Sequence, residues 1–249
     1  MTTEFTGLHA VVTGAGSGIG LAVAQALHEA GARVYGFDIA KGEMAAFAQY
    51  VQCDVGSDVS VKSAFEVVAK STEVIDIVSN NAGIGSVGTI CDATTEEWMN
   101  LLNINVVGIS RVSAGAAPFL RKSKAGAIVN TCSIAAAAGI PMRAVYSASK
   151  GAVMSLTLAM AADFIGDRIR VNAVNPGTAD TPWVERLLSR ADDPAGERAA
   201  LESRQPLGRL VSAPEVARAI LYLASPLQGS TTGTILPVDG GMFGLRLPK

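Results

Sequence analysis

A phenol and an ammonium group lie four residues apart in the stretch NTCSIAAAAGIPMRAVYSASKGAV, residues 130–153. On a helix Tyr146 and Lys150 would project from the same face, because residues i and i+4 are neighbours there. A cation beside a phenol favours the phenolate, and the Ser133 hydroxyl could share the substrate oxygen that Tyr146 protonates or deprotonates. These residues predict an acid–base site that still needs a reaction partner.

A glycine-rich turn near the N-terminus supplies a candidate partner. Residues 8–13 form an apolar, β-branched run typical of a buried strand, and residues 21–30 have a helical pattern. The sequence GAGSGIG, residues 14–20, lies between them. Glycines let the backbone approach a pyrophosphate closely, and a helix N-terminus offers free N–H groups with partial positive charge. Strand, glycine turn and helix in this order predict a dinucleotide site.

A carboxylate, Asp38, ends the next expected strand at residues 33–37. At this distance after a glycine loop it can accept hydrogen bonds from both adenosine ribose hydroxyls. The same charge would repel a 2′-phosphate, and the residues that follow are Ile39 and Ala40 rather than arginine. We therefore expect the cofactor to be NAD rather than NADP.

Apolar runs and helical patterns alternate along the rest of the chain. Further strands are expected at residues 50–53, 74–79, 127–131, 168–174 and 235–238. Helices are expected at residues 41–48, 57–70, 95–120, 146–164 and 214–223. Seven strands alternating with helices predict an α/β fold over residues 1–249, a single-domain, Rossmann-like three-layer sandwich around a seven-stranded parallel sheet.

Two stretches depart from the regular alternation of strands and helices. Asn105 and Gly108 are unusual in the middle of the expected helix at residues 95–120, and indicate either a kink or a polar group placed under the active site. The charged stretch at residues 180–204 has no regular pattern, so we expect a mobile substrate lid over about residues 178–210.

The composition excludes several other classes of protein. A formal net charge of −2 favours neither nucleic acid nor an anionic membrane surface, and no apolar run could span a bilayer. The N-terminus has no signal-peptide pattern. Cys53, Cys91 and Cys132 are widely spaced, and the histidines are His9 and His28. We expect neither a disulfide framework nor a metal site, which fits a reducing cytoplasm.

Taken together, these motifs resemble those of the short-chain dehydrogenase/reductase family of the three-layer Rossmann type. The resemblance covers essentially the whole chain, with the motifs in the family's order and spacing. It is carried by TGAGSGIG at residues 13–20, NNAG at 80–83, Asn105, Ser133, YSASK at 146–150, and Pro176-Gly177.

The resemblance implies roles for the acid–base residues. Tyr146 would be the general acid or base, and Lys150 would support it and bind the nicotinamide ribose. Ser133 would hydrogen-bond the substrate oxygen, and Asn105 would hold a water in a proton relay through Lys150. It also implies a homotetramer built by the long helices near Trp98 and Tyr146. The implied NAD-binding residues are Gly14, Ser17, Gly18, Ile19, Asp38, Asp54, Val55, Asn81, Ala82, Gly83, Tyr146, Lys150, Pro176, Gly177, Thr178 and Thr181.

The substrate is expected to be a small molecule. The segments at residues 176–186 and 204–209 are similar to dehydrogenases of bacterial deoxy-sugar catabolism, L-fucose dehydrogenase among them, which oxidise a pyranose at C1. Ser133, Arg143, Tyr146 and Trp183 are the expected substrate contacts. Two alternatives stay open: a 3-oxoacyl thioester reductase, and a catalytically silent NAD-binding sensor or scaffold. Asp38 disfavours the first, and the complete set of catalytic residues disfavours the second.

Overall fold

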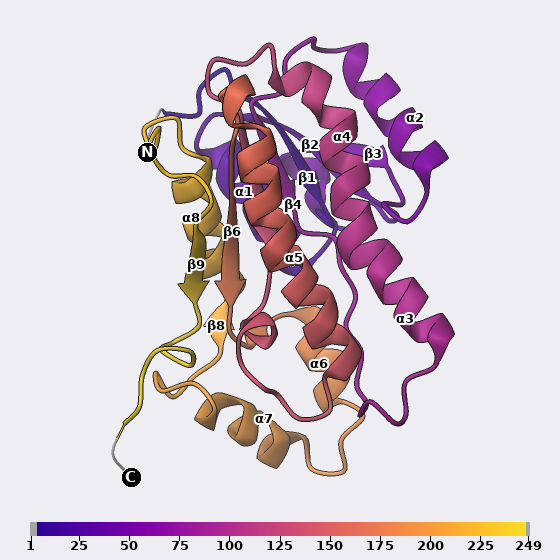
Figure 1. Ribbon diagram of the computed structural model, residues 1–249, viewed down its shortest axis with the longest axis vertical. Helices are drawn as coiled ribbons and strands as arrows, with labels where there is room; N and C mark the ends of the chain where they lie inside the picture. Colours follow the sequence, from indigo (N-terminus) through magenta and orange to yellow (C-terminus); the bar gives the residue numbers. More distant parts are fainter. Residues whose placement is uncertain (1–3, 248–249) are drawn as a thin grey trace.

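The centre of the protein is a seven-stranded parallel sheet, seen in a computed structural model that describes residues 4–247 (Figure 1). Its strand order is β3-β2-β1-β4-β5-β6-β9. The strands are β1 His9–Thr13, β2 Arg33–Asp38, β3 Gln49–Gln52, β4 Ile77–Asn80, β5 Ala127–Thr131, β6 Arg170–Pro176 and β9 Ile235–Val238. All neighbouring pairs are parallel, which confirms the predicted fold class.

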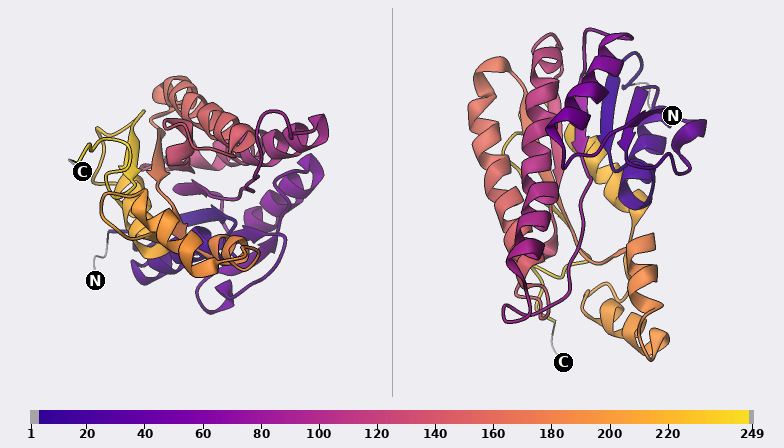
Figure 2. Two further views of the ribbon diagram at one scale, coloured as in Figure 1. Left: turned by 90° about the horizontal axis from the view of Figure 1, so that it is seen from below. Right: turned by 90° about the vertical axis from the view of Figure 1, so that its right-hand side faces the viewer.

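Helices cover both faces of the sheet, so its central strands are buried on both sides, whereas the edge strands β3 and β9 are partly exposed (Figure 2). Successive residues of β1 alternate between two cores: Val11 packs with α2, α4 and α5, whereas Ala10 and Val12 pack with α1 and α8. These helices are α1 Gly18–Glu29, α2 Asp58–Ala69, α4 Gly108–Leu120, α5 Ala144–Asp163 and α8 Ala213–Ala224. No helix in residues 4–247 is both long enough and apolar enough to cross a membrane.

The order of the strands reverses between β1 and β4. The chain runs from β1 outward through β2 to β3, and then returns to the other side of β1 as β4. In open parallel sheets, connections leave in opposite directions at such a point, and a crevice forms outside the carboxyl ends of the strands. The glycine turn after β1 and the loop after β4 therefore face a common cleft.

The long helix expected at residues 95–120 is interrupted. It consists of α3 Thr95–Leu102, a π-helical turn at Asn103–Val107, and α4. A π turn has i→i+5 hydrogen bonds, so it accommodates an extra residue within an α-helix, and it is frequent at functional sites. Here it places Asn105 in the interior, where only 1% of its surface is exposed. Of the two alternatives, a kink or a polar group near the site, the structure shows the second, with Asn105 buried in the π turn.

The helix expected at residues 41–48 is wrong. Only a short 3-10 turn forms, at Met44–Ala46. Gly42 adopts φ +51°, a left-handed conformation, and a Cβ there would collide with the carbonyl oxygen of Gly16. The segment is shaped by its close approach to the glycine turn, which a helix would prevent.

The lack of regular structure expected at residues 180–204 is also wrong, whereas the mobile substrate lid over about residues 178–210 stays a prediction. This stretch holds α6 Pro182–Leu188 and α7 Pro194–Ser203, flanked by the paired short strands β7 Ala179–Asp180 and β8 Val211–Ser212. Each helix begins with proline, and the Asp193 side chain caps α7 by accepting from the Gly196 N–H at 3.0 Å. Both helices lie beyond the carboxyl ends of β6 and β9 (Figure 1). We call residues 179–212 the cap.

Candidate active site

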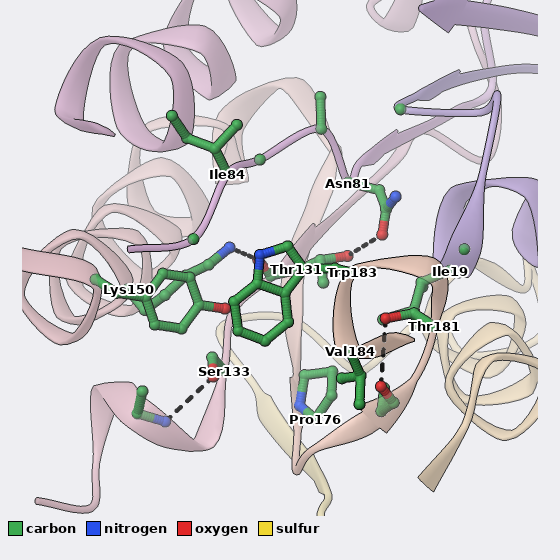
Figure 3. Close-up of a pocket in the computed structure, with 18 of the residues that line it drawn as sticks. Ile19, Asn81, Ile84, Thr131, Ser133, Lys150, Pro176, Thr181, Trp183 and Val184 are labelled. Carbon is green, nitrogen blue, oxygen red and sulfur yellow. Dashed lines mark hydrogen bonds between the residues drawn. The ribbon is translucent and has the colours of Figure 1, made fainter. Parts of the chain in front are cut away.

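A cavity of about 450 Å³ lies at the carboxyl ends of the strands, between the sheet and the cap (Figure 3). It brings together all sixteen residues that the sequence assigns to cofactor binding, and also Ser133, Arg143 and Trp183. Asn105 is the predicted catalytic residue that does not line it. Among residues 4–247, no three His, Cys, Asp or Glu side chains gather as ligands for a metal ion.

The glycine turn is shaped to approach an anion. Gly14 and Gly18 adopt φ +66° and +56°, and a Cβ on Gly20 would collide with the Gly14 carbonyl. Ser17 precedes α1 without capping it through its side chain, and no acidic residue lies in the first turn. The first N–H groups of α1 are therefore open to a phosphate, so this turn fits the pyrophosphate of a dinucleotide.

The Asp38 carboxylate is fixed at the end of β2. Its two oxygens accept hydrogen bonds from the Gly16 N–H at 2.9 Å and the Ala40 N–H at 3.1 Å. A carboxylate oxygen keeps further acceptor capacity after one such bond, so Asp38 can also receive ribose hydroxyls. Together with the glycine turn, this residue fits an adenosine ribose.

The floor of the cavity is held by two threonine hydroxyls. Thr13 Oγ1 accepts from the N–H groups of Asn81 and Ala82 at 2.9 and 3.0 Å. Thr131 Oγ1 donates to Asn81 Oδ1 at 3.1 Å, as Figure 3 shows. The loop after β4 is thereby fixed to both neighbouring strands, β1 and β5. Thr131 was absent from the sequence-predicted site, although a hydroxyl residue at the end of a central strand was a usable signal.

Lys150 lies buried beside Tyr146. Its ammonium nitrogen donates to the Thr131 carbonyl at 2.8 Å and lies 5.8 Å from the centroid of the Tyr146 ring. An ammonium has three donors, and within residues 4–247 this is the one hydrogen bond that Lys150 Nζ makes. Its other donors are available to the hydroxyls of a nicotinamide ribose, which is the contact that the sequence predicts.

Ser133 is placed by a short turn at the end of β5. It caps the 3-10 turn Ile134–Ala136, with its Oγ accepting from the Ala135 N–H at 3.2 Å. The hydroxyl proton remains free to be donated to a substrate oxygen. Tyr146 lies in the first turn of α5 and lines the same cavity. The acid–base residues and the dinucleotide turn thus face one space.

Asn105 lies directly behind this space. Its Oδ1 accepts from the Ile84 N–H at 2.8 Å, and its Nδ2 donates to the Ile84 carbonyl at 2.9 Å and to Ser149 Oγ at 3.1 Å. The side chain therefore ties the π turn to the loop after β4 and to α5. The relay water assigned to Asn105 stays a prediction. Its observed hydrogen bonds hold the loop after β4 and α5 in place behind the cavity.

Comparisons with known proteins agree with this geometry. A family model described as "Enoyl-(Acyl carrier protein) reductase" matches residues 14–243. "Dehydrogenase/reductase SDR family member 6" of Rattus norvegicus is 39% identical over 234 residues, which cover 93% of this chain and 95% of that protein. The chain belongs to the short-chain dehydrogenase/reductase family.

Two further relatives indicate the range of chemistry within this short-chain dehydrogenase/reductase group. Cis-4-hydroxycyclohexanecarboxylate dehydrogenase of Sinomonas cyclohexanicum is 38% identical over 242 residues, covering 93% of this chain and 95% of the relative. The aldohexose dehydrogenase structure from Thermoplasma acidophilum superposes with a TM-score of 0.93 at 31% identity, over 100% of both chains. The chain is an oxidoreductase for alcohol, ketone or sugar substrates, with a nicotinamide cofactor.

The cap and the start of α5 line this dehydrogenase/reductase site together, and they include a residue that sequence reasoning missed. Gly85 lies against the Trp183 indole, where a Cβ would come within 2.9 Å of the ring. The Arg143 guanidinium lies 5.2 Å from the centroid of the Trp183 ring and donates to the Ser86 carbonyl at 2.8 Å. Arg204, which was not among the predicted substrate contacts, also lines the cavity. The cap and the start of α5 therefore share one wall.

The cysteines of this dehydrogenase/reductase should differ sharply in reactivity. Burial raises the pKa of the Cys132 thiol, against the opposing effects of Lys150 and of a Ser133 backbone hydrogen bond, and burial raises that of Cys53 to about 12. Cys91 is exposed. We expect N-ethylmaleimide at pH 8 to label Cys91 quickly and the other two only after unfolding, as read by peptide mass spectrometry. Fast labelling of Cys132 in the folded enzyme would contradict this.

Proposed function

We propose that this protein is an NAD-dependent dehydrogenase that oxidises a secondary alcohol or a sugar hemiacetal. The observation that carries the proposal is that Tyr146, Lys150 and Ser133 line the same cavity as the glycine turn and Asp38. Bound NAD would supply the acceptor for the hydride that leaves the substrate carbon. Tyr146 takes the hydroxyl proton, Lys150 stabilises the phenolate that does so, and Ser133 orients the substrate oxygen by donating to it.

The experiment that tests this proposal is an NAD-reduction screen with purified protein. The panel contains small and cyclic secondary alcohols and a series of aldoses, L-fucose included. Relatives named for an aldohexose and for a hydroxycyclohexane ring support substrates of this size. We expect NAD-dependent turnover of at least one member. Absence of turnover across the panel, in a folded protein that binds NAD, would contradict the proposal.

The NAD assignment depends on Asp38. Replacing it by serine should raise the KM for NAD by roughly 10- to 100-fold, because charge-assisted hydrogen bonds to the ribose are lost. The double variant Asp38→Ser/Ile39→Arg should reverse the preference towards NADP, since Ile39 is 70% exposed and can be replaced without disturbing the core. The measurement is kcat/KM with each cofactor, with Tm monitored because Asp38 also holds Gly16 and Ala40. Equal efficiency of the unaltered enzyme with both cofactors would refute the assignment.

Two alternatives are separated by the same assays. The family description supports a reductase for acyl thioesters, and NADPH-dependent reduction of a 3-oxoacyl thioester, with no alcohol oxidation, would favour that reading. A sensor or scaffold would bind NAD without any turnover. The presence of Ser133, Tyr146 and Lys150 around one cavity favours an enzyme over both a sensor and a scaffold.

The proposal includes a homotetramer working in a reducing cytoplasm. Large apolar side chains are exposed on the helices assigned to subunit contacts, namely Met99 on α3, Val107 in the π turn and Leu158 on α5. The three cysteines are free, which is compatible with a reducing compartment. Light scattering on the purified protein measures the assembly directly.

A further inference from the structure

Three arginines, Arg143, Arg186 and Arg204, line the cavity at its substrate end. We propose that they form a binding site for a carboxylate of the substrate, so that the substrate is a small hydroxy acid rather than a neutral alcohol or sugar. The proposal rests on the dehydrogenase function proposed above and assigns the substrate class of the same site. The arginines come from three places: the residue before α5, the helix α6, and the end of α7.

Charge is distributed unequally along the cavity. Its acidic lining residues are Asp38 and Asp54. Asp38 ends β2 and Asp54 follows β3, so both lie at one side of the sheet. Its basic lining residues are the three arginines and Lys150, all from segments that follow β5 or β6. The end that holds Ser133 and Tyr146 is therefore positively charged. A bound anion is attracted to that end and away from the adenosine end.

Two arginines of the cap that do not line the cavity are paired with carboxylates. Arg198 forms an ion pair with Asp180 at 2.7 Å, and Arg209 forms one with Glu215 at 2.7 Å. Within residues 4–247, no carboxylate lies within ion-pair distance of Arg143, Arg186 or Arg204. Arg190, which is exposed and does not line the cavity, forms no ion pair within residues 4–247 either, so the lack of a carboxylate matters for the three arginines that share one cavity.

Arg143 is the best fixed of the three. It is half-buried, and its guanidinium is oriented by the Ser86 carbonyl and the Trp183 ring. Burial lowers its pKa, and the positive charge of Arg204 acts in the same direction, against Tyr146 and Glu197. Arg143 and Arg204 carry like charges that repel each other, and an anion bound between them would relieve that repulsion. This arrangement favours a carboxylate over a neutral sugar hydroxyl.

The site leaves limited room for the substrate. Arg143 immediately precedes α5 and Tyr146 lies in its first turn, so both ends of the substrate are bound near the start of one helix. A molecule whose hydroxyl reaches Tyr146 and whose carboxylate reaches the guanidinium groups shares a cavity of about 450 Å³ with the dinucleotide, and is therefore small. The planar guanidinium matches a carboxylate through two parallel hydrogen bonds, which fixes the molecule's orientation as well as its charge.

The test compares acids with their uncharged amides. The substrates are 3-hydroxybutanoate, 4-hydroxybutanoate and cis-4-hydroxycyclohexanecarboxylate, each beside its primary amide, together with the aldose panel. The variants are Arg186→Gln, Arg204→Gln and Arg204→Lys. Arg190→Gln is the matched control, because Arg190 is exposed, lies one turn beyond Arg186 and does not line the cavity. Calorimetry with cyclohexanecarboxylate and cyclohexanecarboxamide, which lack the hydroxyl, measures binding without turnover.

We expect the intact enzyme to prefer an acid to its amide. Either glutamine variant should lower kcat/KM for that acid by roughly 10- to 100-fold and change that for the amide little. Arg204→Lys should recover part of the loss, and Arg190→Gln should match the intact enzyme. Calorimetry should show cyclohexanecarboxylate binding that the glutamine variants weaken.

Other outcomes separate this proposal from the one it rests on. Turnover of aldoses or amides at rates equal to those of the acids would overturn the carboxylate site and leave the dehydrogenase function intact. Carboxylate binding that depends on Arg186 and Arg204, without any turnover, would support the site and overturn the dehydrogenase. A variant that raises the KM of NAD alone would assign its arginine to the cofactor diphosphate, against the proposal.

Discussion

Replacing Tyr146 by phenylalanine should lower kcat by roughly 10²- to 10⁴-fold. The change removes a single oxygen from the ring that lines the cavity beside Lys150. Without it, no side chain is left to take the substrate proton, because Lys150 is held by the Thr131 carbonyl and Ser133 serves as a donor. The ring itself remains, so the packing of α5 is preserved. The measurement is the steady-state rate with the best substrate of the NAD screen.

The control for Tyr146→Phe is the same exchange at a distant phenol. Tyr222 lies on α8 and is 48% exposed, so Tyr222→Phe should keep the full rate. NAD affinity, measured by calorimetry, should change little in either variant, because the glycine turn and Asp38 lie outside the change. A Tyr146→Phe enzyme with near wild-type kcat would remove the tyrosine from the acid–base step. Loss of NAD binding instead would show that its hydroxyl mainly supports the cofactor.

Features carried by adjacent residues were predictable from the sequence. The central strands contain apolar runs because the sheet is buried on both faces there, and the alternation of strands with helical patterns located all seven. Asp38 could be assigned because it immediately ends such a run, and the glycine turn because its neighbours are a strand and a helix. Tyr146 and Lys150 share a helix, so their proximity follows from spacing alone.

Features that depend on small local energies or on tertiary contacts were not predictable. The π turn at Asn103–Val107 leaves the hydrophobic pattern of a continuous helix almost unchanged. The cap helices bury only a few apolar residues, Leu188 and Leu201 among them, so their charged surfaces concealed the helical pattern. That Arg143, Arg186 and Arg204 line one cavity depends on where α6 and α7 lie in the fold, which the sequence does not show. Residues this far apart in the sequence cannot be assigned to one site before the fold is known.

Replacing Arg170 by methionine should lower the free energy of unfolding by about 3–5 kcal/mol. This arginine lies on β6, is 8% exposed, and burial lowers its pKa. Its guanidinium donates to the carbonyls of Leu223, Ala224 and Ser225 at 2.6, 3.1 and 3.0 Å, at the C-terminus of α8. The positive charge thus meets the negative end of the helix dipole and satisfies carbonyls that have no partner within the helix. Methionine fills similar space but leaves those carbonyls buried and unsatisfied.

The measurement for Arg170→Met is urea denaturation at a fixed protein concentration, which keeps any contribution of assembly constant. Arg168→Met is the matched control, because Arg168 is exposed two residues earlier and its substitution should change stability by no more than about 0.5 kcal/mol. The loss in Arg170→Lys should fall between those of Arg170→Met and Arg168→Met. An ammonium keeps the positive charge, but it lacks the planar set of donors with which the guanidinium reaches several carbonyls. A loss below about 1 kcal/mol in Arg170→Met would mean that water replaces the guanidinium at the end of α8. The junction between β6 and α8 would then not depend on this charge.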